Sequence, residues 1–313
     1  MKPGRSCIWV VILTAGWAVS AALAQEPASK PQKMSSAVVV DELEFIYRFE
    51  NSGTTELVSR ARVSIRTVEG RDSFGQLYFP FQAQLGDVQV RYVRTVKPSG
   101  QIIEASVEQP MEITAPVAQQ APVFSDLRFK VVPVAGLDAG DRLEYEVLTR
   151  TRVPLKPGDF WMTHYPTRTV TVLAEHVTVE FPLDRRVTLK IDETGAYVVE
   201  DSNARRHYRW TLSNPKPQKG KALQKPLFTL SSLASWSEVG RWYRALEAGR
   251  LGLTPEIESM VRELVAGKKN PPEKLEAIYR FVSQSIRYVS ISLGLGGYQP
   301  HRAAEVLQNQ YGD

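Results

Sequence analysis

Residues 38–50, VVVDELEFIYRFE, begin a long series of short β-rich runs that decides the fold of this 313-residue chain. In several runs apolar and polar residues alternate, as in the set Val63, Ile65 and Val68. A period of two is typical of strands that bury one face. The later runs are residues 58–69, 88–96, 141–153, 168–182 and 186–192.

The series predicts an antiparallel β-sandwich-like domain over residues 38–212. Val88, Val90 and Tyr92 repeat the alternation, and no helical run lies between the strands. Many short strands separated by turn-forming residues are typical of a sandwich. An open sheet with helices on one side is the alternative. The turns are expected at residues 98–100, 138–140 and 193–195.

Residues 213–226 form a break, after which the period becomes helical. The prolines of the break prevent regular pairing, and no aromatic residue is interleaved with its lysines as a stacking platform, so we expect a solvated linker. The pattern of residues 227–313 predicts amphipathic helices. With almost no sheet to pack against, these helices cannot bury all their apolar faces by themselves. The fold class is therefore α+β with an incomplete second part. Its expected elements are helices beginning after Ser235 or Ser237, at Thr254-Pro255 and after Asn270, a strand at 287–293 and a last helical turn at 303–309.

The first 24 residues predict a secretory signal peptide. Lys2 and Arg5 precede an apolar run that ends in the small-residue pattern Ala22-Leu23-Ala24. We expect cleavage after Ala24, a flexible lead-in at residues 25–37 and a periplasmic or secreted bacterial protein. An uncleaved membrane anchor is the alternative, because the apolar run approaches the length that spans a bilayer. No transmembrane segment is expected after cleavage, since no later apolar run is long enough.

Charge and cysteine content exclude several classes of protein. The formal charge of +5 falls to +3 when Lys2 and Arg5 are removed, and so small a charge does not indicate nucleic-acid binding. The single cysteine, Cys7, lies in the leader. An internal disulfide, a cysteine zinc site and an iron–sulfur cluster are therefore excluded. We expect no metal and no cofactor.

The residues alone single out no active site. The sequence has no G-x-S-x-G elbow, no H-x-x-x-H pair and no phosphate-cradling glycine loop. His176 and His207 lie in strand-like runs, where a structural or exposed role is expected. His164, in FWMTHYP, is expected at a core or turn position. The carboxylates of a glycosidase are paired only in space, and nothing in the sequence singles out such a pair.

The second part of the chain resembles the bacterial transglutaminase-like superfamily. This resemblance rests on the helix EKLEAIYRFVSQSIRYV, the loop GLGGYQP and the terminal stretch AAEVLQNQYGD. The β-rich part, including ELEFIYRFENSGTTELVSRARVSIRTVEG and VRTVKPSGQIIE, resembles the partner known as domain of unknown function 3857. Together the two resemblances cover nearly the whole mature chain.

The resemblance implies cysteine-dependent acyl transfer or amide hydrolysis, on a protein or peptide substrate. In the superfamily the motif Tyr311-Gly312-Asp313 is followed by the nucleophilic cysteine at a helix N-terminus, where free N–H groups and the helix dipole lower the thiol pKa. A histidine and an aspartate arrive later. The resemblance therefore predicts that this chain is truncated just before its nucleophile and is itself inactive.

Two further residues are candidates for substrate or oxyanion contacts in a complete protein, Gln299 and Tyr288. Loop anchoring and core packing are their alternative roles. His301 precedes the nucleophile position and is not carried over as the triad base. A non-catalytic periplasmic or cell-surface β-sandwich binding module is the alternative function for the whole chain. A secreted carbohydrate-active sandwich has no supporting motif.

Overall fold

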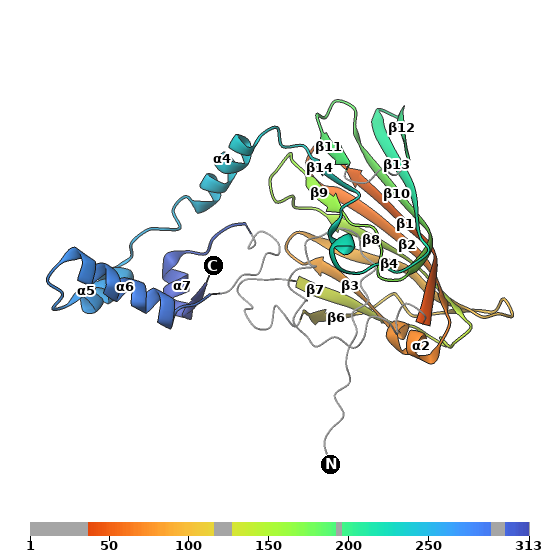
Figure 1. Cartoon of the computed structure of the whole chain (residues 1–313), viewed down its shortest axis with the longest axis horizontal. Helices are drawn as coiled ribbons and strands as arrows, with labels where there is room; N and C mark the ends of the chain where they lie inside the picture. The colour runs from red at the N-terminus through yellow and green to blue at the C-terminus, as the bar shows by residue number, and fades with distance from the viewer. Residues whose placement is uncertain (1–36, 116–126, 192–195, 289–297, 313) are drawn as a thin grey trace, which may run out of the picture. The chain divides into compact units, whose positions relative to one another are not determined.

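The computed structural model describes residues 37–115, 127–191, 196–288 and 298–312. They form two compact units, with the boundary between Ala234 and Ser235. The first unit is built mainly of strands and the second mainly of helices (Figure 1). This division confirms the predicted α+β class.

One eight-stranded sheet organises the first unit (Figure 1). Its strand order is β12-β13-β10-β1-β2-β8-β4-β5, so β12 and β5 are its edges. The strands are β1 Val38–Phe49, β2 Thr55–Ile65, β4 Gly86–Val96, β5 Ile102–Glu104, β8 Arg142–Thr151, β10 Thr171–Pro182, β12 Tyr197–Ser202 and β13 Arg205–Asn214.

The central strand β1 has one parallel and one antiparallel neighbour. Phe45 of β1 lies opposite Val177 of β10 in the parallel pair and opposite Ser59 of β2 in the antiparallel pair. The other described pairs of this sheet are antiparallel, as predicted. A parallel pair needs a crossover connection rather than a tight turn. Here the strands from β2 to β9 all lie between β1 and β10 in the sequence.

Two three-stranded sheets, β3-β7-β6 and β11-β14-β9, supply the second layer. Side chains of all three sheets form one apolar core, which includes Phe45 and Trp210 of the large sheet, Phe79 of β3 and Phe228 of β14. Burial of this surface supplies the main driving force for the sandwich. The bounds are β3 Gln76–Gln82, β6 Met111–Thr114, β7 Leu127–Pro133, β9 Trp161–His164, β11 Thr188–Ile191 and β14 Phe228–Ser231.

The opposite face of the large sheet carries rows of arginine–glutamate pairs. Glu144 accepts hydrogen bonds from Arg94 at 2.7 Å and from Arg142 at 2.8 Å, and Glu146 accepts one from Arg60 at 2.8 Å. Burial raises the pKa of both carboxyl groups, but the hydrogen bonds outweigh it and hold each pKa below its usual value of 4.5. These pairs keep one face polar while the other packs into the core.

A short helix interrupts the strand series, so the expectation of no helix there is wrong. This helix, α2 (Val68–Phe74), begins where the Thr67 hydroxyl accepts a hydrogen bond from the N–H of Gly70 at 3.3 Å. Val68 therefore lies in a helix and is 50% exposed, whereas Val63 and Ile65 are buried in β2 as the alternation predicts. β2 ends at Ile65, and the alternation does not continue because the Thr67 hydroxyl caps the helix that begins at Val68.

The alternation in β4 changes phase at a bulge. The register between β4 and β8 shifts between Val90 and Tyr92. Val88 and Val90 are buried, but beyond the shift Val93 is buried and Tyr92 is only half-buried. An extra residue in one strand exchanges the two faces, so the expectation that Tyr92 continues the buried row is wrong.

Two predicted turns are confirmed. Gly100 and Gly140 adopt φ values of 87° and 94°, in the left-handed region that glycine tolerates. The N–H of Gly100 donates to the carbonyl of Lys97 at 2.9 Å and closes the first of these turns. The third predicted turn, residues 193–195, lies outside the described residues.

The predicted linker is partly integrated into the first unit. Asn214 is buried, and its amide donates to the carbonyls of Arg168 and Val170 at 3.1 Å and 2.7 Å. A 3₁₀ turn, η2 (Gly220–Gln224), follows. β14 was expected in the second part, but it is the middle strand of its sheet because Phe228 fills the core. The first unit therefore extends to Ala234.

The second unit has helices at the predicted positions. Each of the first three begins at a capping side chain: Ser235, Thr254 and Asn270 accept hydrogen bonds from backbone N–H groups three residues later. β15 (Arg287–Tyr288) and β16 (Tyr311–Gly312) form a two-stranded parallel sheet. The helices are α4 Trp236–Glu247, α5 Pro255–Val265, α6 Pro271–Ser285 and α7 Ala303–Asn309.

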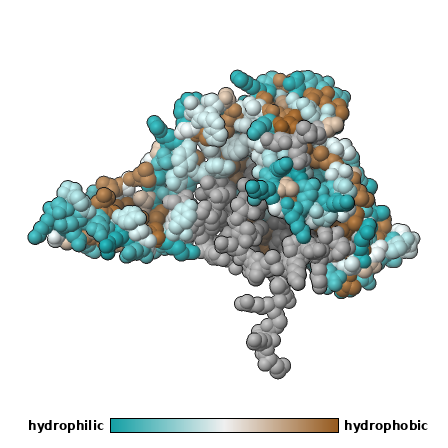
Figure 2. Space-filling model, viewed as in Figure 1, coloured by the Kyte–Doolittle hydropathy of each residue, from teal (hydrophilic) through white to brown (hydrophobic). Residues whose placement is uncertain are grey.

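None of these four described helices has a buried residue. Trp236 is 88% exposed, and Leu275 and Tyr279 of α6 are each 69% exposed. Figure 2 shows apolar residues among polar ones on the surface of the helical segment. These exposures agree with the prediction that the helices alone cannot bury their apolar faces.

The predicted leader, residues 1–24, lies outside the described residues, as does all of the lead-in except Ala37, which is buried. No helix within the described ranges is both long and apolar enough to cross a bilayer.

A buried histidine connects the two layers of the sandwich. His164 ends β9 with none of its surface exposed, and its ring stacks on Phe228 at a centroid distance of 5.6 Å. Its Nε2 lies 3.2 Å from a carboxylate oxygen of Glu175 in β10, and its Nδ1 lies 3.1 Å from the hydroxyl of Tyr47 in β1. Glu175 and Tyr47 are thus the hydrogen-bond partners of the two ring nitrogens of His164.

The Tyr47→Phe substitution should lower the free energy of unfolding by about 1–3 kcal/mol, because it leaves Nδ1 of the buried His164 without its hydrogen-bond partner. Burial, reinforced by the charge of Glu175, raises the pKa of Tyr47 well above its usual value of 10.0, so the native residue stays a donor. Urea titration measures the change. Tyr92→Phe, on the half-exposed side of β4, is the control and should change the free energy by less than about 0.5 kcal/mol. Equal effects of the two substitutions would contradict the assignment.

Candidate functional site

The described motif residues, Tyr311 and Gly312, form β16, which meets β15 and α7 at one corner of the second unit. We treat this corner as the candidate site. β15 and β16 pair in parallel, with Arg287 opposite Tyr311 and Tyr288 opposite Gly312. The N–H of Arg287 donates to the carbonyl of Gln310 at 2.9 Å, which extends this pairing toward α7. Gln310 has φ 58° and turns the chain out of α7 into β16. The pairing therefore fixes the position of the last described residues against β15.

Gly312 is the most tightly packed residue of this corner. It is buried, and a Cβ atom at this position would lie 2.6 Å and 2.7 Å from the two methyl carbons of Val306 in α7. Any larger residue would push β16 away from the helix. The absence of a side chain thus lets strand and helix approach closely.

Tyr311 lies against β15 rather than in open solvent. It is half-buried, and the guanidinium carbon of Arg287 lies 5.2 Å from the centre of its ring, within the range of a cation–π contact. This contact holds the tyrosine of the motif in place. Asp313, the last residue of the motif, lies outside the described residues.

The two candidate contact residues differ in exposure. Tyr288 is 76% exposed, so core packing, the alternative role considered for it, does not describe its surroundings. Gln299 is half-buried and follows Tyr298, whose ring centre lies 5.4 Å from that of Trp242 in α4. The structure brings Tyr288 beside the motif through backbone pairing. Among the described residues, no hydrogen bond or ion pair joins Gln299 to the motif, and residues 289–297 of the preceding segment are not described.

Three of the four histidines lie in the first unit and have partners there. His164 and Glu175 have the arrangement of a base and its orienting acid, but their side chains are 0% and 3% exposed. No substrate can reach them, so the pair is structural. His176 and His207 lie on strands of the large sheet, at 3.3 Å from Thr211 and 3.5 Å from Glu180. This confirms the structural or exposed role expected for both.

No sequence signal pointed to the Tyr47–His164–Glu175 group. Tyr47 and His164 are 117 positions apart, and only the parallel pairing of β1 with β10 brings β1 next to Glu175. A single histidine among aromatic residues indicates a core position, but it does not name its partners.

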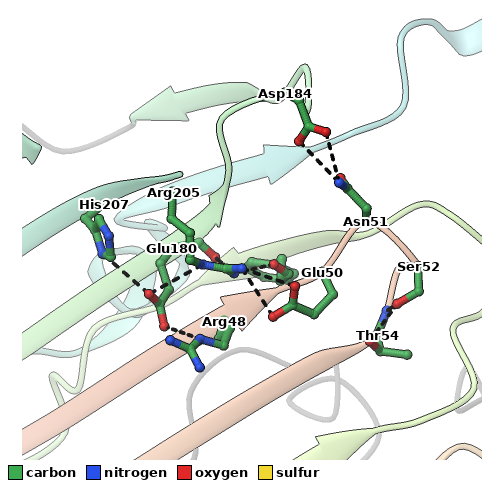
Figure 3. A network of polar contacts seen from close by, with 10 residues as sticks. Arg48, Glu50, Asn51, Ser52, Thr54, Glu180, Asp184, Arg205 and His207 are labelled. Carbon is green, nitrogen blue, oxygen red and sulfur yellow. Dashed lines mark hydrogen bonds and ion pairs between the residues drawn. The ribbon is translucent and has the colours of Figure 1, made fainter. Parts of the chain in front are cut away.

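A second polar network lies where β1 and β10 end and β13 begins (Figure 3). Glu180 accepts a hydrogen bond from Arg48 at 2.7 Å and lies 3.6 Å from Nε of Arg205. Arg205 in turn donates to Glu50 at 3.1 Å and to the carbonyl of Phe49 at 2.5 Å. This ion-pair network connects three strands.

An open depression of about 520 Å³ lies beside this network, bordered among others by Asn51, Asp184 and Arg205. The amide of Asn51 donates to Asp184 at 3.2 Å, so the polar groups of the rim are already engaged with one another. The arrangement ties loops together and offers no reactive group. Among the described residues, no group of three histidine, cysteine or acidic side chains could hold a metal ion.

The fold is similar to that of a protein from Parabacteroides distasonis ATCC 8503 that is provisionally named a protease. The TM-score is 0.73, the two sequences are 18% identical, and the match covers 89% of this chain. This chain spans 56% of the length of that protein. At so low an identity, the structural match shows that the two proteins share a fold, and nothing beyond that.

Two structures of M1 zinc metallopeptidase from Deinococcus radiodurans share less. Each is 11% identical, with TM-scores of 0.35 and 0.36, and the matches cover 62% and 73% of this chain and 42% and 53% of the metallopeptidase chains. Similarity at this level carries no argument about this protein. No curated protein matches the chain.

The family model described as "Domain of Unknown Function with solved-structure structure" (DUF3857) matches residues 51–219. The matched residues include most of the large sheet, from the turn after β1 through β13, and both polar networks contain some of them. The match spans more than half of the sequence, and the chain therefore belongs to the DUF3857 family.

Proposed function

We propose that this chain is the amino-terminal portion of an exported bacterial transglutaminase-like protein that carries out cysteine-dependent acyl transfer or amide hydrolysis. In that protein the nucleophilic cysteine follows Asp313, and a histidine and an aspartate come later. The domains are a signal peptide at residues 1–24, a lead-in at 25–37, the β-rich unit that contains the DUF3857 match and extends to residue 234, and the front part of the catalytic domain at 235–313.

The observation that carries this proposal is the pairing of β15 with β16. Tyr288 lies opposite Gly312, so the end of β16 lies beside an exposed tyrosine. A helix that starts there would direct its free N–H groups and positive dipole end at its first residues. A cysteine in that position would have a lowered thiol pKa and act as a nucleophile at neutral pH.

The comparison with solved structures supports the same proposal. The Parabacteroides protein shares the fold over 89% of this chain, is about 1.6 times as long, and is provisionally named a protease. Amide hydrolysis and transamidation both pass through an acyl-enzyme, so one cysteine site serves either reaction. In the complete protein, Tyr288 and Gln299 would then contact the substrate or its oxyanion.

The 313-residue chain should show no transamidation and no peptidase activity, because its single cysteine lies in the leader. The assay measures incorporation of a fluorescent amine into a glutamine-containing protein, and cleavage of the same protein, by purified chain. A longer chain that continues through the next codons of its gene is the matched comparison and should gain thiol-dependent activity. Turnover by the 313-residue chain above the buffer control would contradict the proposal.

Export predicts a processed amino terminus. Protein produced with its full leader in a bacterial host should begin at Gln25 and contain no titratable thiol, because cleavage removes Cys7. Amino-terminal sequencing and intact mass measure both properties. Replacing Ala22 and Ala24 with bulky residues should block cleavage. A mature protein that keeps residues 1–24 in the unmodified sequence would instead indicate a membrane anchor.

The alternative function is a non-catalytic periplasmic or cell-surface binding module. The exposed edge strand β12 favours it, because an uncovered strand can bind another polypeptide. The codon after Asp313 distinguishes the two functions. A cysteine codon favours the enzyme, and a stop codon favours the module.

A further inference from the structure

The backbone of β12 presents unused hydrogen-bonding groups at the edge of the large sheet. A two-residue turn, Asn203-Ala204 with φ values of 52° and 58°, connects β12 to β13. Both φ values belong to a type I′ hairpin, in which the residues flanking the turn form a hydrogen-bonded pair. Hydrogen-bonded and non-hydrogen-bonded pairs alternate along an antiparallel ladder. Tyr197, Val199 and Asp201 therefore direct their N–H and C=O groups away from β13.

No other described strand pairs with this edge of β12. The strand, YVVEDS, contains no proline and no lysine, and its register with β13 runs without a bulge. Proteins commonly protect sheet edges with those features. Tyr197, Val198 and Val199 are 45%, 62% and 46% exposed. This edge is therefore unprotected and apolar at one end.

The acidic residues of β12 do not protect it either. Glu200 accepts a hydrogen bond from Arg209 at 2.6 Å, and Asp201 accepts two from Arg206 at 2.9 Å each. Both arginines lie on the neighbouring strand β13. Because each carboxylate is already paired within the same hairpin, its charge does not repel an approaching strand.

We propose that β12 pairs antiparallel with β12 of a second copy of this chain, about a twofold axis at Val199. The register follows from the groups that point outward. Only alignments that set Tyr197, Val199 and Asp201 against one another can form hydrogen bonds. Centring the pair on Val199 uses all three residues of both copies. It sets Tyr197 opposite Asp201 of the second copy and Val198 opposite Glu200 of the second copy.

The two neighbouring registers are worse. Centring the pair on Glu200 leaves Tyr197 outside the ladder, because its partner would be Asn203 in the turn of the second copy. Centring it on Val198 leaves Asp201 outside the ladder. The outward backbone groups of β12 thus select one register, in which two eight-stranded sheets join edge to edge.

The side chains on the core face also favour a second copy. Tyr197 and Val199 lie opposite Trp210 and Tyr208 of β13, and the ring centres of Tyr197 and Trp210 are 5.7 Å apart. This aromatic row runs from the buried Trp210 out to the exposed edge. Pairing about Val199 brings Val199 of both copies together on this face. Apolar area that is exposed in the single chain becomes covered.

Sedimentation velocity of the full chain over a rising concentration series tests the proposal. We expect a monomer–dimer equilibrium. Val199→Pro removes only an outward N–H, because Val199 does not hydrogen-bond to Tyr208, and it should weaken dimerisation at least about tenfold. Val199→Thr keeps the N–H and the β-branch, and it should dimerise like the unchanged chain. Circular dichroism confirms that both variants are folded.

A cross-link tests the register itself. In a Cys7→Ser background, Val199→Cys should form a covalent dimer on mild oxidation, since hydrogen-bonded antiparallel partners have Cα atoms about 5.5 Å apart, within disulfide range. Val198→Cys lies opposite Glu200 of the second copy and should not cross-link. A chain that stays monomeric at every concentration would overturn the proposal and leave the edge for a strand of another protein. A dimer unaffected by Val199→Pro would also overturn it and place the contact elsewhere.

Discussion

The parallel pairing of β1 with β10 is the interaction on which the rest of the first unit depends. It places β1 in the middle of the large sheet, with hydrogen-bonded neighbours on both sides. It also places Tyr47 and Glu175 on adjacent strands, where both can reach His164 of the second layer. Because residues far apart in the sequence meet at this pair, its formation commits most of the chain to one arrangement.

Each strand of the large sheet separates two environments. Its core face carries the apolar cluster that includes Phe45 and Trp210, and its other face carries ion pairs such as that of Arg94 with Glu144. A shift of register by one residue would exchange these faces and bury the charges. The arginine–glutamate rows therefore help to specify the register as well as to keep the sheet hydrated. The second unit contrasts with this arrangement, since its described helices bury no residue.

Local signals in the sequence predicted local structure well. Thr254-Pro255 and Asn270 marked the starts of α5 and α6, because capping and proline act within one turn of a helix. Alternation also located the strands of the sandwich. It failed at Tyr92 and at Val68, where a bulge and a capping threonine changed the local geometry without changing composition. β14 was assigned to the wrong unit, because a strand of four residues carries little pattern.

The candidate site was predicted from its motif and not from its surroundings. The pattern around Tyr311 and Gly312 named the corner, but only the structure placed Tyr288 opposite Gly312 and Val306 against it. The partners of His164 could not be predicted at all, since they depend on strand pairing over long distances in the sequence. Residues whose role depends on close packing or distant pairing leave no local pattern.

Hydrogen exchange of the full chain, followed by mass spectrometry, tests the central claim that β1 and its neighbours form a unit that does not depend on the helices. Amides of β1, β2, β8 and β10 should exchange together and slowest, through global unfolding. Amides of α4, α5 and α6 should exchange at least about tenfold faster, because their apolar faces are exposed. Equal protection of strands and helices, or early exchange in β1 and β10, would contradict this account.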